Sequence, residues 1–447
     1  MARGATHVLG LDIGTQAIKA VELKLAGREI RMIGRPVVVP TPEHAVSGGR
    51  VVDTAAVSEA LAELMTLNGF TTKKVVASVG GDTDVVVRIT QVPKMTGKEL
   101  DEAIQWELER QAPFPVDQAV YDYQPIDRPD TPAEAQEMDV LLAVAQEEMV
   151  DAHVETIMAA KLAPVAVDVE PLAIARALVD AGGEALEDQT IVIVHIGSSN
   201  TAIIIVRKGL LAFVRTIPTA GAALTSAIRQ NMTEDEASAE RAKRLFADLS
   251  GSYAYDEGGA PAATDGTSAF DAVGDAEDTD SVFEVSDADQ HVDYGAAPAL
   301  DEAATQLEVD TSQAYAVPPD QPVAAAEPSG ARAATEPVPA EVEAVRAQVY
   351  EAIAQPLLDL ATEVRRSLDF YRRGHRDEDI DRLCLTGGSA VIPGLAAFLG
   401  GEIGLNVEVA DPFEHVVVEE GATDEFLRDV GPMCVIAVGL AMRDMFG

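Results

Sequence analysis

Apolar and polar positions along the chain follow two periods, one typical of strands and one typical of helices, and the two kinds of segment alternate. Apolar runs of strand length predict strands at 8–13, 17–24, 28–39, 74–79, 84–92, 119–125, 138–146, 166–170, 381–386 and 407–409. Apolar residues at helical spacing predict helices at 54–68, 96–111, 147–162, 170–178, 222–246, 341–373 and 433–445. This mixture predicts an α/β protein.

Several helix boundaries carry recognisable signals. Thr96 and Glu99 have the spacing of a capping box at the start of the helix predicted at 96–111. Gly69 is suited to end the helix predicted at 54–68. Pro356 stands inside the long helix predicted at 341–373, where its missing N–H predicts a kink or a break between two helices.

One phrase occurs twice. Residues 8–34 and 191–217 each contain an apolar run, an Ile-Gly-Ser/Thr break, a second β-rich run and a turn at a glycine. An offset of 183 positions superposes Gly14 on Gly197 and places His195 where the first copy has Asp12. Two such hairpins predict duplicated halves that form a two-lobed nucleotide-binding protein.

Composition excludes several classes of protein. The 447 residues carry a net charge of −42, which argues against nucleic acid or an anionic membrane surface as the direct ligand. The only two cysteines, Cys384 and Cys434, lie in apolar stretches, which indicates core thiols in a reducing compartment. The N-terminus lacks the pattern of a signal peptide, and the longest candidate for a membrane span, 385–405, is interrupted by glycines, Pro393 and Glu402. We therefore expect a soluble, cytoplasmic protein.

An acidic segment interrupts the pattern of strands and helices. Residues 247–340 contain 20 acidic residues and one basic residue, together with many Gly, Ser, Ala and Pro. Such a composition cannot bury enough apolar area to offset the entropy of ordering, so the sequence predicts a disordered insertion inside a folded domain. Ser281–Val285 is either a docking motif or an incidental apolar cluster in a solvated linker.

Residue types in the first hairpin suit a phosphate and a metal ion. Asp12 ends an apolar strand, Gly14 lets the backbone turn so that N–H groups converge, and Thr15 and Gln16 follow in the turn. Lys19 lies on the next strand, where it can help to neutralise charge. Asp12 is the candidate ligand for a water-coordinated Mg²⁺.

Two further segments complete the candidate site. The second hairpin offers backbone and hydroxyl donors at Gly197, Ser198, Ser199 and Asn200. Downstream, a predicted strand ends in paired glycines that let a flat base and ribose approach the backbone, at Gly387, Gly388 and Ser389. The three segments together predict a nucleotide cleft between two lobes.

With these segments the chain resembles the actin-like ATPase superfamily, which has a ribonuclease H-like fold. Within it, the chain is similar to the PilM family of type IV pilus assembly proteins, chiefly at 103–123, 167–172 and 365–371. The resemblance implies binding of ATP with Mg²⁺. It also implies a groove that holds the N-terminal cytoplasmic tail of a PilN-like protein, and recruitment to the inner face of the cytoplasmic membrane by partners.

The resemblance also implies a division into subdomains. Subdomain 1A is expected from 1–74 and 430–447, the partner-binding 1C from 75–165, 2A from 166–225 and 379–429, and 2B from 226–246 and 341–378, with the acidic insertion at 247–340. The groove for the PilN-like tail is expected between 1A and 1C. Charge alone suggests that the insertion contacts other proteins of the pilus machinery.

Catalysis depends on residues that depart from the family pattern. His195 stands where the superfamily usually has an aspartate, and imidazole is a poor Mg²⁺ ligand, so at most a slow ATPase is expected. His195 is either an inert packed side chain or a partly cationic group that contacts phosphate.

Asp168 and Glu170 are weak catalytic candidates that can orient water. Alternative hypotheses are a sugar-kinase-type phosphotransferase with Asp168 as its base, and a filament-forming protein of the FtsA kind.

Overall fold

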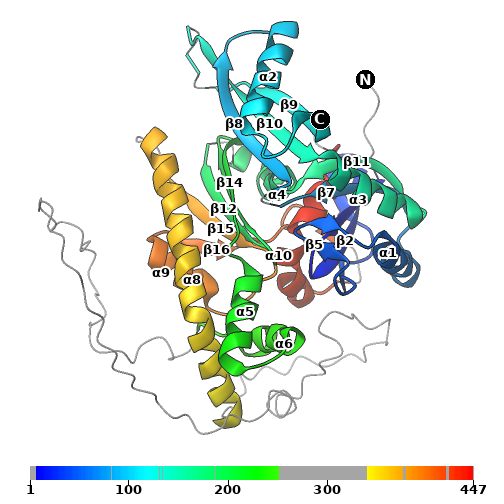
Figure 1. The fold of residues 1–447 in the computed structure, drawn as a ribbon, viewed down its shortest axis with the longest axis vertical. Coiled ribbons are helices and arrows are strands. Elements are labelled where there is room, and N and C mark those ends of the chain that lie inside the picture. The colour runs from blue at the N-terminus through cyan, green and yellow to red at the C-terminus, as the bar shows by residue number, and fades with distance from the viewer. Residues whose placement is uncertain are drawn as a thin grey trace, which may run out of the picture.

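The structure is a computed structural model that describes residues 7–81, 83–129, 131–132, 134–186, 188–250, 340–375, 379–418 and 422–445. Three larger sheets organise it (Figure 1). Most of the acidic segment for which the sequence predicts disorder, 251–339, lies outside the described residues. The beginning of the predicted insertion is different, because Ala247 is buried and the Leu249 amide donates to the Pro393 carbonyl at 2.7 Å.

The first sheet has seven strands. It is ordered β11-β7-β1-β2-β3-β17, with β4 also paired to β2. Its strands are β1 (His7–Ile13), β2 (Ala17–Ala26), β3 (Glu29–Met32), β4 (Val37–Pro40), β7 (Lys74–Val79), β11 (Ala163–Val169) and β17 (Val417–Val418). The predicted strand at 28–39 was wrong as a single element, because Gly34 has a φ of 70° and divides it into β3 and β4.

The five-stranded sheet repeats the same plan in the order β14-β13-β12-β15-β16. Its strands are β12 (Thr190–Ile196), β13 (Thr201–Arg207), β14 (Leu210–Ile217), β15 (Arg382–Thr386) and β16 (Val407–Val409). Ile13 pairs with Ile18 in the first hairpin, and Ile196 pairs with Thr201 in the second. Both pairs differ by 183 positions, so the structure confirms the internal repeat down to its strand register.

A three-stranded sheet stands at one end of the molecule, in the order β8-β10-β9 (Figure 1). It comprises β8 (Val85–Pro93), β9 (Ala119–Ile126) and β10 (Glu137–Gln146), and α2 (Lys98–Gln111) packs on it through Leu100, Ile104 and Leu108. The predicted capping box is wrong: α2 begins after Gly97, which makes no side-chain cap. The predicted unit at 75–165 is shorter, because β7 and β11 pair within the first sheet.

Helices cover both large sheets. On the first lobe lie α1 (Thr54–Asn68) and α3 (Glu147–Ala159), near the small hairpin of β5 (Val46–Ser47) and β6 (Arg50–Val51). On the second lobe lie α5 (Gly221–Met232), α6 (Glu236–Phe246), α8 (Ala340–Gly374) and α9 (Leu395–Ile403). Short 3₁₀ turns occur at η1 (Val116–Gln118) and η2 (Asp180–Leu186). The helix α8 continues through Pro356, so the predicted break between two helices is wrong.

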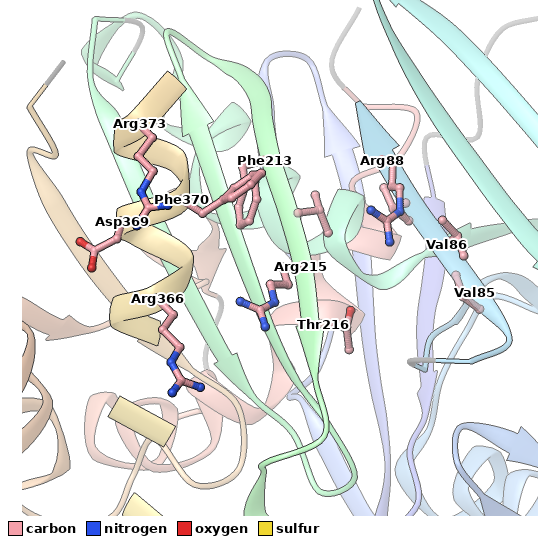
Figure 2. A pocket seen from close by; sticks show the side chains of 12 residues that line it. Val85, Val86, Arg88, Phe213, Arg215, Thr216, Arg366, Asp369, Phe370 and Arg373 are labelled. Atoms are coloured by element: carbon pink, nitrogen blue, oxygen red, sulfur yellow. The ribbon is translucent and has the colours of Figure 1, made fainter. Parts of the chain in front are cut away.

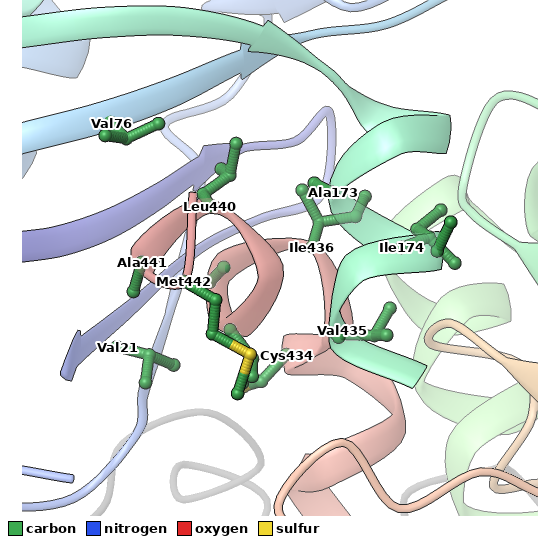
Figure 3. Close-up of a cluster of buried hydrophobic side chains, with 14 of the residues drawn as sticks. Val21, Val76, Ala173, Ile174, Cys434, Val435, Ile436, Leu440, Ala441 and Met442 are labelled. Atoms are coloured by element: carbon green, nitrogen blue, oxygen red, sulfur yellow. The ribbon is translucent and has the colours of Figure 1, made fainter. Parts of the chain in front are cut away.

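The helices α4 (Glu170–Leu178) and α10 (Asp424–Ala441) form the centre of the molecule. Their apolar side chains pack with those of β2 and β7 in one buried cluster (Figure 3). The prediction that the last helix starts at 433 was wrong, because Pro432 lies inside it and Thr423 caps its first turn. Cys384 and Cys434 are buried as predicted, and burial raises the pKa of each thiol to about 12.

The close approach of α4 and α10 depends on glycine. A Cβ atom at Gly439 would stand 1.8 Å from the Ala173 carbonyl oxygen. Gly439→Ala is therefore expected to destabilise the protein by about 2 kcal/mol, measured by urea denaturation. Gly401→Ala in α9 is the matched control, since nothing lies within 4 Å there and alanine is expected to stabilise the helix. Equal midpoints for the two variants would contradict this packing.

Candidate functional site: two facing hairpins between the lobes

The first hairpin turns tightly at the end of β1. The Gly14 amide donates to the Ala17 carbonyl at 3.1 Å, and a Cβ at Gly14 would stand 2.8 Å from the Lys19 ammonium. Thr41 fixes the turn from outside, since its hydroxyl donates to the Gly14 carbonyl at 2.7 Å and its amide donates to the Gln16 carbonyl at 3.1 Å. Only a residue without a side chain fits at position 14.

A buried ion pair lies under this turn. The Lys19 ammonium is 3.1 Å from the Asp12 carboxylate, as expected from residues that face each other across β1 and β2. Burial lowers the pKa of Lys19, but the Asp12 charge and hydrogen bond outweigh burial, and the net pKa is raised. The first hairpin therefore presents a protonated lysine beside the predicted metal-ligand carboxylate.

The second hairpin has the same turn. The Gly197 amide donates to the Asn200 carbonyl at 3.0 Å, the counterpart of the bond between Gly14 and Ala17. The beginning of α5 supports this turn, because the Gly221 amide donates to the Gly197 carbonyl at 3.0 Å and the Ala222 amide donates to the Ser198 carbonyl at 2.8 Å. Residues 197–200, like residues 14–16, are only half-buried, so both turns remain accessible.

The two hairpins meet. The hydroxyls of Thr15 and Ser199, from turns 184 residues apart in sequence, are 3.0 Å apart. The chain therefore brings together two glycine turns with hydroxyl groups, a lysine and a carboxylate. A ligand that bears several anionic oxygens can contact both turns at once.

His195 lies beneath the second turn and is almost fully buried. Burial first, and then the charge of Lys19, lower the pKa of His195 to about 3, and its Nδ1 atom has no hydrogen-bond partner among the described residues. These surroundings favour the inert, packed imidazole over the partly cationic group in contact with phosphate. The neutral imidazole cannot supply the negative charge of the aspartate that it replaces.

Glu170 lies close to the same charges. Its carboxyl group packs on Gly80, where a Cβ would stand 2.0 Å from the carboxyl carbon. Burial, together with the nearby Asp12 charge, raises the pKa of Glu170 to about 7. A cavity of about 20 Å³, lined in part by Glu170 and Asn200, has room for one water molecule.

Asp168 is differently placed. Its carboxylate is 3.0 Å from Arg176 and 3.6 Å from Arg443, and it also accepts a hydrogen bond from the Val169 amide. These contacts fasten β11 to α4 and α10. The sugar-kinase hypothesis needs an available base at this position, and this arrangement does not favour it.

The paired glycines form the third segment of the site. A Cβ at Gly387, whose φ is 99°, would stand 2.2 Å from the Ile196 carbonyl oxygen, so the end of β15 packs directly on the end of β12. Gly388 faces open space, since nothing lies within 4 Å of its Cβ position. Ser389 is buried, with its hydroxyl 2.9 Å from the Cβ position at Gly221. The third segment is therefore adjacent to the second turn, as predicted.

Sequence reasoning missed a buried lysine beside these glycines. The Lys243 ammonium donates to the Gly221 carbonyl at 3.1 Å, to the Thr225 hydroxyl at 2.8 Å and to the Glu240 carboxylate at 2.7 Å. Burial lowers the pKa of Lys243, although Glu240 opposes the shift. The available signal was a lysine on the apolar face of α6, which buries Ala239, Ala242 and Phe246.

Metal-binding side chains are sparse. No group of three or more His, Cys, Asp or Glu side chains that can hold a metal occurs in the described part of the chain. Asp12, the predicted Mg²⁺ ligand, is paired with Lys19.

Within the described residues, no helix is both long and apolar enough to cross a membrane.

The repeated sheets and the glycine turns between two lobes define an actin-like ATPase fold. A family model described as type IV pilus assembly protein PilM matches residues 10–256 and 346–445. The chain therefore belongs to the PilM family of type IV pilus assembly proteins.

The chain is also similar to solved structures. The similarity to a structure of the PilM–PilN type IV pilus biogenesis complex covers 98% of each chain, with 25% sequence identity and a TM-score of 0.69. The similarity to the ethanolamine utilization protein EutJ from Carboxydothermus hydrogenoformans covers 99% of this chain and 91% of the EutJ chain. The sequence identity is 14% and the TM-score is 0.46. The similarity to MreB5 of Spiroplasma citri bound to ADP covers 97% of this chain and 95% of the MreB5 chain, with a sequence identity of 12% and a TM-score of 0.41.

Proposed function

We propose that this protein is a cytoplasmic, ATP-binding adaptor of type IV pilus assembly that binds the N-terminal tail of a PilN-like membrane protein. The observation that carries the nucleotide site is the 3.0 Å contact between Thr15 and Ser199, which joins the two glycine turns. The partner is supported by family membership and by the likeness to a PilM–PilN complex over 98% of each chain.

In this proposal each segment of the site has one role. Residues 14–16 and 197–200 receive the phosphates of ATP, and Lys19 neutralises part of their charge. The adenosine lies along Gly387, Gly388 and Ser389, near Lys243. Glycine is required at Gly14 and Gly197, where a Cβ would collide with the turn itself, and at Gly387, where it would collide with the end of β12. The bound nucleotide supplies anionic oxygens that bridge the two lobes.

The site is less suited to rapid hydrolysis. Asp12 is the carboxylate that would hold Mg²⁺ with its waters, and the second turn offers the neutral His195 instead of a second carboxylate. Glu170 lies beside a cavity for one water and can orient that water when ionised, so hydrolysis is expected to be slow. Nucleotide binding then serves mainly to fix the angle between the lobes.

The partner groove is proposed between subdomains 1A and 1C. Here 1C corresponds to the unit of β8, β9, β10 and α2, and 1A to the first sheet with α1 and α3. The edge strand β9 approaches α3 and carries the exposed side chains Val120 and Tyr121. An exposed strand edge with apolar side chains is suited to an extended peptide.

The test is a calorimetric titration with a synthetic PilN-type tail peptide, with and without ATP. ATP is expected to change the peptide affinity of the native protein by about tenfold, a coupling of about 1.4 kcal/mol. Gly197→Val should abolish this response, because a Cβ there would stand 2.9 Å from the Asn200 carbonyl oxygen. Gly401→Val, where nothing lies near, is the control. Peptide binding that ignores ATP, or no binding, would overturn the proposal.

A further inference from the structure

A cleft lies between the three-stranded sheet, the five-stranded sheet and α8, beside the place where β8 and β14 approach each other. It consists of two adjoining cavities of about 620 and 1040 Å³. Both cavities are lined by Arg88 of β8, Phe213 of β14, and Phe370 and Arg373 of α8 (Figure 2).

The cleft is basic in a strongly acidic chain. Its lining contains six arginines and two aspartates, whereas the whole chain has a net charge of −42. Four of the arginines are paired with Glu107, Asp139 or Glu363. Within the described residues, Arg88 and Arg373 have no carboxylate partner, and both are exposed. Asp369 of α8 lines the smaller cavity together with Arg366 and Arg373 (Figure 2).

The cleft also has an aromatic wall. The rings of Phe213 and Phe370 are 5.9 Å apart and tilted, and Phe370 is 66% exposed. Tyr371 stacks on His375 at 4.3 Å nearby. Such a large exposed aromatic side chain between arginines is suited to a ligand that carries both an aromatic ring and carboxylates.

Two strand edges border the cleft. In the described part of the chain, β8 pairs with β10 alone and β14 pairs with β13 alone, and residues 85–88 and 213–216 of these edges line the smaller cavity. Unpaired strand edges present backbone donors and acceptors to an extended peptide. The expected ligand is therefore an extended, acidic peptide with an aromatic residue.

We propose that the occupant is a segment of this chain, residues 276–290, and that Phe283 packs against Phe213 and Phe370. This sequence, AEDTDSVFEVSDADQ, has six acidic residues, no basic residue, and the β-rich cluster Ser281–Val285 around Phe283. It matches the cleft in charge, in aromatic content and in strand propensity. The backbone of the segment adds to the edge of β8 or β14, and its carboxylates pair with Arg88 and Arg373.

The connecting chain is long enough. The cleft lies at the C-terminal end of α8, whose 35 residues span about 50 Å. The 54 residues between Val285 and Ala340 can span up to about 180 Å. Tethering gives an effective concentration of the order of millimolar, so a weak intrinsic contact is sufficient for occupancy.

The experiment uses the full chain with benzoylphenylalanine in place of Phe283, irradiated and mapped by mass spectrometry. Cross-links within one molecule to residues 213–216 or 366–373 are expected. The variant with Arg88→Glu and Arg373→Glu should reduce them about tenfold, as should 1 M salt. Arg372→Glu, an exposed neighbour outside the cleft lining, is the matched control and should leave them unchanged. Benzoylphenylalanine at Phe270, in the same acidic segment, controls for non-specific contact.

Three results would overturn the proposal. Cross-links that map outside the cleft, or equal yields from positions 283 and 270, would show that the cleft does not select this segment. Cross-links between molecules that rise with protein concentration would show that the occupant comes from a second copy. Separately, a synthetic peptide of residues 276–290 should bind a variant lacking that segment at least tenfold more tightly than it binds the native chain. Equal affinities would also contradict the proposal.

Discussion

Glu170→Gln is expected to stabilise the protein by about 3 kcal/mol at most at pH 8, and to change its stability little at pH 4.5. Burial, and then the nearby Asp12 charge, raise the pKa of Glu170 from 4.5 to about 7. In the native state the carboxyl group therefore holds its proton up to about pH 7, whereas the unfolded chain releases it near pH 4.5. Each unit of difference corresponds to about 1.4 kcal/mol.

The sign follows from proton binding. Between pH 4.5 and 7 the native state binds more protons than the unfolded chain, so stability falls as the pH rises through this window. Above pH 7 the full cost of a buried carboxylate is present, and glutamine removes it without changing the shape of the side chain. Urea denaturation at the two pH values measures the difference.

The control is Glu155→Gln on α3, where the side chain is exposed. Exposed substitutions of this kind usually change stability by less than about 0.5 kcal/mol. A stabilisation by Glu170→Gln that is equal at pH 4.5 and pH 8 would mean that the carboxyl group is not held in its protonated form.

Much of the fold was predictable because the central strands are apolar enough to be recognised in the sequence. The first strand of each central hairpin, β1 or β12, is almost fully buried and mainly apolar, each run ends at Gly14 or Gly197, and the repeat is visible in the sequence alone. Where local signals competed with tertiary contacts, the predictions were less accurate. Pro432 and Pro356 lie inside helices whose apolar faces are buried against the core, and this packing outweighs the lost backbone hydrogen bonds.

The contacts within the site were less accessible to sequence reasoning. The loops that carry Thr15 and Ser199 were predicted, but their contact depends on how α4 and α10 hold the two lobes together. The lysine at 243 stands on the apolar face of α6, but its burial against Gly221 and Thr225 depends on how α5 packs there. The pKa shifts of Glu170 and His195 come first from burial and then from the charges of Asp12 and Lys19 on another strand pair, and no spacing in the sequence reveals such tertiary surroundings.

His195→Asn is expected to make the protein less sensitive to acid, by about 3 kcal/mol between pH 7 and pH 4.5. Burial, and then Lys19, lower the pKa of His195 from 6.5 to about 3, so the native state excludes a proton that the unfolded chain accepts below pH 6.5. The unfolded chain then binds more protons, and the stability that the neutral imidazole contributes is lost as the pH falls from 6.5 toward 3. Asparagine does not titrate, so the variant lacks this loss of stability at low pH.

The control for this prediction is His44→Asn, because His44 is exposed and its φ of 58° suits asparagine. A parallel pH dependence of His195→Asn and the native protein would contradict a buried neutral imidazole.

The slopes from His195 and Glu170 oppose each other. Acid weakens the native state through His195 and strengthens it through Glu170, by similar amounts between pH 4.5 and 6.5. These two residues should therefore add little net pH dependence to the native protein in this window, and the same holds for a variant that carries both substitutions. Each single variant should show the pH dependence of stability that comes from the residue it retains, and the two dependences should have opposite signs. Single variants that shift in the same direction would show that the two groups do not titrate as their surroundings require.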